Sequence, residues 1–276
     1  MPNTSRRSNN RGKYSGSRKK GRRKVSRKRS KAPFFLAVAG ILLIGAVVAI
    51  WKYNPGNIVD KAAELLNVED ARSAVKVVHK KRVVLNVPLI NQMDDPKLYN
   101  GCEVTSLAMV LNYNGIDVTK SELADNIETV PFQYDNGEHG NPNDGFVGSV
   151  SGSTSAGLGV YHGPIYNLAK QYADNVYDLT GSNFDTVVNK VEEGHPVWTI
   201  TTTAFAPVSD FESWDTPDGK IDVTYSEHSV CITGFDRDKR VIYVNDPYGY
   251  KNREVDWNDF AAAYKQMGKQ AVYVTK

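Results

Sequence analysis

Cys102 is the residue of this sequence whose position most suggests chemistry, because it follows a glycine and opens an apolar run. The apolar positions in this run have helical spacing: Val104, Leu107, Ala108 and Leu111. Cys102 would then lie in the first helical turn, where unpaired backbone N–H groups and the helix dipole favour an anion. The thiolate is the reactive form of cysteine, and such a position can lower the pKa of the thiol. The pattern predicts a nucleophile at Cys102; the alternative is a small buried apolar residue.

A base and an orienting carboxylate for this nucleophile are expected on two neighbouring strands. His228 begins an apolar strand, and Asp246 ends the next strand immediately before a proline. Adjacent antiparallel strands lie about 4.8 Å apart, so a carboxylate on one can orient an imidazole on the other. We therefore expect Cys102 to attack, His228 to take its proton and later protonate the leaving amine, and Asp246 to hold the imidazole.

The loop regions supply a possible oxyanion donor but no cofactor site. Gln92, on the loop before the nucleophile, could donate its side-chain amide to the oxyanion beside the Cys102 backbone N–H. The glycine-rich stretch 131–164 lacks Gly-Lys-Ser and Gly-Lys-Thr, which argues against a phosphate-binding loop. We expect this stretch to form a long loop at the rim of the site, where His139 and His162 could contact substrate. No carboxylate and histidine stand four residues apart on a predicted helix, so we expect neither a metal nor another cofactor.

The sequence has two cysteines, and a disulfide between Cys102 and Cys231 is the simplest alternative to a free nucleophile. Successive side chains of a strand point to opposite faces of the sheet. If His228 faces Cys102, then Cys231 faces away from it. We therefore expect two free thiols.

These residues require a domain in which helices precede most of the strands. Helical spacing and capping patterns predict helices at 102–113, 119–126, 165–172, 184–191 and 256–268. Strand-forming residues predict strands at 83–90, 196–203, 227–235, 241–247 and 271–274, with an acidic loop at 204–224. The order of these helices and strands along the chain predicts an α+β fold in which N-terminal helices pack on an antiparallel sheet.

The N-terminal part of the chain predicts a membrane anchor. Residues 1–31 contain 14 Lys or Arg and no acidic residue, whereas the remainder carries 20 basic and 31 acidic residues. Residues 32–51 include 19 consecutive uncharged positions, about enough for a helix to cross a bilayer core of roughly 30 Å. The basic flank predicts that the tail stays in the cytoplasm, with a stalk at 52–82 and a domain at 83–276 outside.

Two other interpretations of this region are open. A signal peptide cleaved after a small residue near 47–49 would yield a secreted protein. The basic tail could bind nucleic acid, but attraction to anionic lipids accounts for it beside a spanning helix, so no nucleic-acid partner is expected.

Several stretches together resemble a known family. They are 87–92 (VPLINQ), 100–109 (NGCEVTSLAM), 140–148 (GNPNDGFVG), 159–161 (GVY), 228–236 (HSVCITGFD) and 245–249 (NDPYG). In this order they resemble the C39-like cysteine peptidases of the papain-like superfamily, in particular the membrane-anchored branch of Gram-positive bacteria. The resemblance covers roughly 83–275 and implies a papain-like fold. It also implies Cys102, His228 and Asp246 as the triad, Gln92 in the oxyanion hole and the glycine-rich loop near the cleft.

The function predicted from these observations is an extracellular, membrane-anchored cysteine peptidase that acts through a thioester on a peptide or protein. A peptidoglycan amidase or endopeptidase with the same triad, cutting cell-wall peptides, is one alternative. A non-catalytic binding module on the same fold is another. A sortase-like transpeptidase is disfavoured because its Thr-Leu-x-Thr-Cys pattern is absent. The sequence does not indicate an oligomeric state.

Overall fold

The computed structural model describes residues 79–153 and 155–276. The predicted tail, anchor and most of the predicted stalk therefore lie outside the described residues. Within the two described ranges, no helix is both long enough and apolar enough to cross a bilayer.

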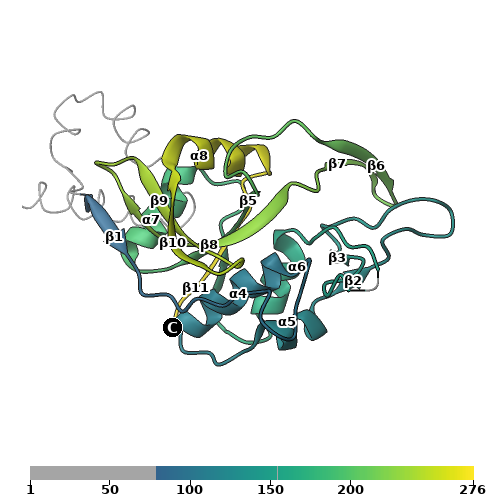
Figure 1. The fold of residues 1–276 in the computed structure, drawn as a ribbon, viewed down its shortest axis with the longest axis horizontal. Helices are drawn as coiled ribbons and strands as arrows, with labels where there is room; N and C mark the ends of the chain where they lie inside the picture. The colour runs from purple at the N-terminus through teal and green to yellow at the C-terminus, as the bar shows by residue number, and fades with distance from the viewer. Residues whose placement is uncertain (1–78, 154) are drawn as a thin grey trace, which may run out of the picture. The chain divides into compact units, whose positions relative to one another are not determined.

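A seven-stranded antiparallel sheet forms the centre of the described domain (Figure 1). Its strand order is β10, β9, β8, β5, β11, β4, and β1 pairs with the second half of β8. The bounds are β1 Arg82–Val84, β4 Val176–Asp178, β5 Val197–Thr202, β8 Glu227–Asp236, β9 Val241–Asp246, β10 Tyr250–Asp256 and β11 Ala271–Val274. The predicted α+β class with an antiparallel sheet is confirmed. All ten residues of β8 are buried, which places this strand in the middle of the fold.

Helices cover both faces of this sheet. They are α4 Cys102–Tyr113, α5 Lys120–Asn126, α6 His162–Ala169, α7 Phe184–Glu193 and α8 Trp257–Gln266. One buried cluster joins α4 and α6 to one face, and a second joins α7 and α8 to the other. Nine consecutive residues of α4 are buried, as expected for a helix that is enclosed on all sides.

Local sequence signals set several of the helix ends. Thr119 caps α5 by accepting a hydrogen bond from the Glu122 backbone, as the capping pattern predicts. Asp256 caps α8 by accepting from two backbone N–H groups. Gly194 ends α7 with a φ of 105°, a conformation that glycine adopts readily. Helix α6 begins three residues earlier than predicted, because Pro164 is accommodated in its first turn.

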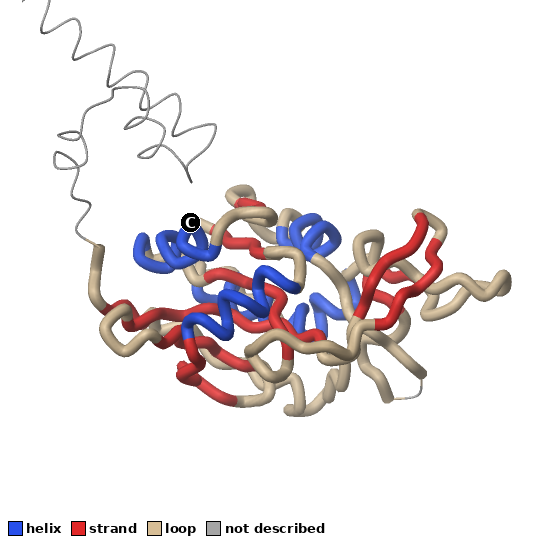
Figure 2. Tube along the Cα trace, turned by 90° about the horizontal axis from the view of Figure 1, so that it is seen from above, coloured by secondary structure: helices blue, strands red, loops and turns tan. Residues whose placement is uncertain are grey.

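The interval predicted to be an acidic loop instead contains a β-hairpin. Strands β6 (Glu212–Thr216) and β7 (Gly219–Val223) pair with each other and pack beside the short parallel strands β2 (Thr129–Val130) and β3 (Phe146–Val147). Figure 2 shows the hairpin at the right of the view, apart from the main sheet. The prediction of a loop is wrong because most outward positions of the hairpin are charged, and only a few residues such as Trp214 and Val223 are buried. We call β2, β3, β6, β7 and the glycine-rich stretch the side lobe.

Cys231 faces α4, contrary to the prediction that it faces away from Cys102. It belongs to the buried cluster that contains the apolar residues of α4. Its cross-strand partner is Trp198, whose indole N–H donates to the backbone oxygen of Glu103 in α4 at 3.0 Å. Alternation along β8 does hold, since Val230 and Ile232 lie in the opposite cluster. The prediction of two free thiols is confirmed.

Candidate active site

Cys102 is the first residue of α4, as the apolar spacing predicts. Gly101 precedes it, and a Cβ at Gly101 would lie only 2.5 Å from the Cβ of Leu98, so the chain can turn into the helix only with glycine there. Within the described residues, the Cys102 backbone N–H has no hydrogen-bond partner. The helix therefore offers one free N–H donor beside the partly exposed thiol.

His228 and Asp246 are in direct contact. His228 Nε2 lies 3.0 Å from Asp246 Oδ1, and both side chains are almost fully buried. Asp246 also accepts from the Tyr248 backbone N–H at 3.0 Å and from Arg253 Nη1 at 2.9 Å. Burial would raise the pKa of Asp246, but hydrogen bonding from His228, Tyr248 and Arg253 outweighs burial and lowers it. Asp246 is therefore a carboxylate that accepts a hydrogen bond from the Nε2–H of His228, which leaves Nδ1 of His228 as the acceptor nitrogen.

The first turns of α4 lie against the beginning of β8, close to His228. Ser106 donates to the backbone oxygen of Ser229 at 3.1 Å. The Tyr248 ring stacks on the His228 ring with centroids 5.3 Å apart. The pKa of Tyr248 is raised by burial and by the charges of Cys102 and Asp246, so this phenol adjoins both. No hydrogen bond joins Cys102 to His228 in the described part of the chain.

Gln92 lies beside the nucleophile but does not point its amide toward it. Its Nε2 donates to the backbone oxygens of Leu98 and Tyr99, at 2.9 and 3.3 Å. Lys120 Nζ in turn donates to the backbone oxygen of Gln92 at 2.9 Å. Gln92 therefore braces the loop that leads into Cys102, and its role as an oxyanion donor stays a prediction.

Two carboxyl groups adjoin the thiol and were not identified from the sequence. Cys102 Sγ donates to Glu103 Oε2 at 3.3 Å, and Glu103 Oε1 accepts from the Val160 backbone N–H at 2.9 Å. Glu227, the residue before His228, faces Glu103, and a Cβ at Gly159 would meet oxygens of both carboxyls, at 2.4 and 3.1 Å. Each acid is the sequence neighbour of a predicted catalytic residue, which is the signal that could have revealed it.

The carboxyl pair controls the electrostatics around Cys102. Burial raises the pKa of Glu103 to about 7. Burial, and then the neighbouring Glu103, raises the pKa of Glu227 well above its ordinary value. Burial, Glu103 and Glu227 together raise the pKa of Cys102 well above its ordinary value. The pKa of Cys102 is therefore raised on balance, opposite to the direction expected from the helix N-terminus alone.

The two histidines of the glycine-rich stretch lie in different places. His139 stacks on Trp214 in the side lobe, with ring centroids 4.1 Å apart. His162 begins α6, and its Nδ1 lies 2.8 Å from Asp178 Oδ2. Among the described residues, no group of three or more His, Cys, Asp or Glu side chains is arranged to hold a metal ion.

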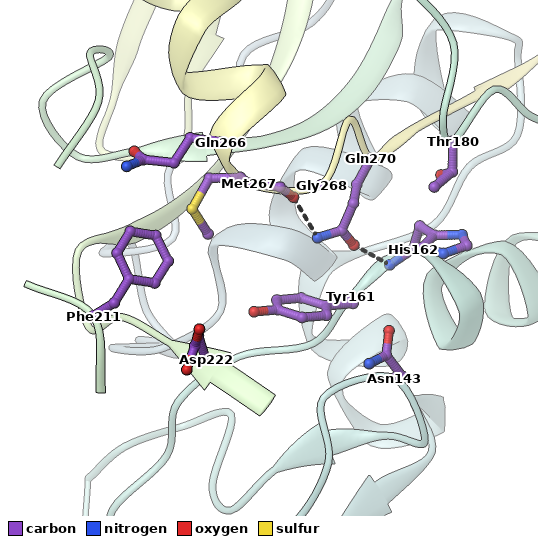
Figure 3. Close-up of a pocket in the computed structure, with 10 residues that line it drawn as sticks. All are labelled: Asn143, Tyr161, His162, Thr180, Phe211, Asp222, Gln266, Met267, Gly268 and Gln270. Carbon is purple, nitrogen blue, oxygen red and sulfur yellow. Dashed lines mark hydrogen bonds between the residues drawn. The ribbon is translucent and has the colours of Figure 1, made fainter. Parts of the chain in front are cut away.

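His162 lines a cavity of about 260 Å³ (Figure 3). Gln270 fixes one wall by donating to the Met267 backbone oxygen at 2.8 Å and accepting from the His162 backbone N–H at 2.9 Å. Tyr161 forms another wall, and its pKa is raised by burial and by the charge of Glu227. Tyr161 therefore lies both on the wall of this cavity and within reach of the charge of Glu227.

Comparison with known proteins gives consistent matches over this domain. The model of the Peptidase_C39 like family matches residues 84–272. The chain is 52% identical over 221 residues to the uncharacterized protein YvpB of Bacillus subtilis (strain 168), covering 80% of this chain and 87% of that protein. A crystal structure of a Bacillus anthracis protein of C39-like peptidase type aligns with a TM-score of 0.68 and 43% identity, covering 71% of this chain and 98% of that chain.

Proposed function

The chain belongs to the Peptidase_C39 like family of cysteine-type peptidases, and on that premise we propose that Cys102, His228 and Asp246 form its catalytic triad. The observation that carries this proposal is the buried His228–Asp246 pair, together with Tyr248, which stacks on His228 and whose pKa is raised by burial and by the nearby charge of Cys102. Because the Nε2–H of His228 donates to Asp246, the other ring nitrogen, Nδ1, is the one that can accept the proton of the Cys102 thiol.

The reaction follows from these positions. His228 Nδ1 takes the proton from Cys102 Sγ, and the sulfur forms a bond to the carbonyl carbon of the substrate. The C–N bond then breaks, His228 protonates the departing amine, and a thioester to Cys102 remains. Water attacks the thioester, His228 removes the water proton, and release of the acid returns the proton to Sγ. Asp246 stabilises the imidazolium in both halves of the reaction.

The developing oxyanion requires donors that are already in place. The unpaired backbone N–H of Cys102 at the start of α4 is the first of these. Gln92 is the proposed second donor. To donate to the oxyanion, its Nε2 would have to break one of its two hydrogen bonds to the backbone oxygens of Leu98 and Tyr99.

The substrate is a peptide or protein, and we propose that it is met outside the cell. This topology is supported by the uncharged stretch in 32–51 behind the basic tail 1–31. Residues 52–82 would then form a stalk and 83–276 the extracellular peptidase domain. A membrane-impermeant thiol reagent applied to intact cells should label Cys102; labelling only after lysis would contradict the topology.

The triad is tested by comparing Cys102→Ala with Cys231→Ala. A fluorescent iodoacetamide and a peptide library are applied to the full-length wild type and both variants. Cys102→Ala should lose labelling and hydrolysis, whereas Cys231→Ala should keep both, because Cys231 is fully buried and burial raises its pKa. Equal labelling of the two cysteines would refute the assignment. Digestion of purified cell wall in parallel distinguishes a general peptidase from one that cuts stem peptides.

A further inference from the structure

Glu103 and Glu227 form a buried carboxyl pair that the proposed triad does not use. Glu103 is 1% exposed and Glu227 is 8% exposed. In the described part of the chain neither carboxyl has a hydrogen bond or ion pair to a cationic side chain, and both oxygens of Glu227 lack any donor. Two adjacent carboxylates without a cation cannot both be ionised in such a site. A proton on Glu227, donated to Glu103, removes the repulsion and gives one of the two unpaired Glu227 oxygens a partner.

We propose that Glu103 and Glu227 share a proton and that this carboxyl pair decides whether Cys102 is a thiol or a thiolate. Glu103 is then a catalytic residue, because its Oε2 lies 3.3 Å from Cys102 Sγ. Glu227 is a positioning residue that acts through Glu103. The inference rests on the proposed function, since it assumes that Cys102 is the nucleophile.

The direction of the effect follows from the hydrogen bond between Sγ and Oε2. When Glu103 is ionised, it accepts the thiol hydrogen and opposes a second negative charge on sulfur. When Glu103 is protonated, its O–H can donate to the thiolate, and the proton lost from Sγ resides on His228. The form of the pair that holds two protons therefore favours the reactive thiolate, and the form that holds one proton suppresses it.

The other titratable groups around the pair do not replace it in this role. Tyr161 adjoins Glu227, and Tyr248 adjoins Cys102 and Glu103. Burial and these neighbouring charges raise the pKa of both phenols, so both stay neutral. Trp198 donates only to the backbone oxygen of Glu103. His228, adjacent to Glu227 in β8, is the remaining titratable neighbour, and it is already the proposed base.

The surroundings of Glu103 bring the loss of the pair's second proton close to neutral pH. The Glu103 carboxyl accepts from the Val160 backbone N–H but has no cationic partner in the described residues, which is less support than a fixed carboxylate requires. Burial raises the pKa of Glu103 to about 7. The second proton of the pair is therefore lost in the range where a cysteine peptidase would be assayed.

The test measures Cys102 alkylation by iodoacetamide, a neutral probe, from pH 5 to pH 9. It uses the full-length protein with Cys231→Ala and adds Glu103→Gln or Glu227→Gln. A unit charge at 3.3 Å, even with the screening of water, shifts the pKa of the thiol by about one unit. Glu103→Gln should therefore speed alkylation at pH 8 by about tenfold or more.

Glu227→Gln should act in the opposite direction. An amide at 227 donates an N–H to Glu103 without supplying a proton, so Glu103 stays ionised to lower pH and alkylation at pH 6 should slow several-fold. Glu254→Gln, which removes one exposed charge on β10, is the matched control and should change neither rate.

Opposite changes in the alkylation rate of the two variants would support the proposal that the carboxyl pair controls the protonation of Cys102. Identical pH profiles in wild type and Glu103→Gln, or shifts of the same sign in both variants, would overturn it while leaving Cys102 as the nucleophile. Absence of Cys102 alkylation in every protein would overturn the proposed function together with this inference. If Glu103→Gln does not fold, Glu227→Gln alone decides, because a mere loss of packing would not move the pH midpoint of alkylation.

Discussion

Replacing Glu103 with Gln should change how the stability of the domain depends on pH. Glu103 keeps its proton in the folded protein up to a pKa of about 7, whereas an unfolded chain releases it near 4.5. The folded state therefore binds the additional proton between these values. The contribution of Glu103 to the free energy of unfolding is therefore fully present below pH 4.5 and is lost as the pH rises through about 7.

The magnitude follows from the width of this window. Each unit of pKa difference is worth about 1.4 kcal/mol, so Glu103 alone should lower the free energy of unfolding by about 3 kcal/mol between pH 4.5 and 7. Glu227 contributes with the same sign, because its pKa is also raised. His195, whose pKa burial lowers, contributes with the opposite sign, so only the difference between wild type and variant isolates Glu103.

The assay is urea denaturation of the full-length wild type and Glu103→Gln at pH 5 and pH 8, followed by circular dichroism. Wild type should lose about 3 kcal/mol more than the variant between the two pH values. Glu254→Gln, a charge change far from the pair in β10, should follow the wild type. Equal pH dependence of wild type and Glu103→Gln would show that Glu103 is already ionised at pH 5 in the folded protein, and the reasoning would fail.

Three substitutions test the other parts of the site. Asp246→Asn should lower kcat by about 10²- to 10⁴-fold in a protein that is still folded by circular dichroism, because an amide cannot stabilise the imidazolium of His228. Gly101→Ala should lower the free energy of unfolding in urea by about 1–3 kcal/mol, because the added Cβ would overlap the side chain of Leu98. Met267→Trp should fill the cavity of Figure 3, and a higher KM for peptides with an unchanged rate of Cys102 alkylation would show that substrate occupies this cavity. Slower alkylation in that variant would show that the change had reached the nucleophile.

Much of the fold was predictable because its signals are local. The caps at Thr119 and Asp256 and the stop at Gly194 each depend on a few neighbouring residues, and all are present in the structure. The hairpin of β6 and β7 was not predictable in the same way. Its strands carry mainly polar and charged residues, and the two aromatic partners of Trp214 in the side lobe, Phe132 and His139, come from a distant part of the sequence.

In the site, too, the features with local sequence signals were predictable and those that depend on long-range packing were not. The order of Cys102, His228 and Asp246 was sufficient to expect a pair on β8 and β9, and the His228–Asp246 contact is present. Alternation along β8 separates Cys231 from Val230 and Ile232, as the structure shows, but it could not show which of the two faces α4 covers. The Glu103–Glu227 pair was not predictable from the sequence, because the two residues are 124 positions apart and only the packing of α4 on β8 brings them together.

The state of the nucleophile depends on which of two opposing effects is larger. The N-terminus of a helix stabilises a nearby anion by up to about 2 kcal/mol. A carboxylate 3.3 Å from the sulfur opposes a thiolate by about 1 kcal/mol with the screening of water and by about 5 kcal/mol at an effective dielectric constant of 20. Glu103 is buried, so the larger value is closer to its situation, and the carboxylate prevails over α4 when it is ionised. Protonation of Glu103 removes that opposition and adds a donor to the sulfur. The helix can then stabilise the thiolate, so the proton on the carboxyl pair, rather than the helix alone, determines the reactivity of Cys102.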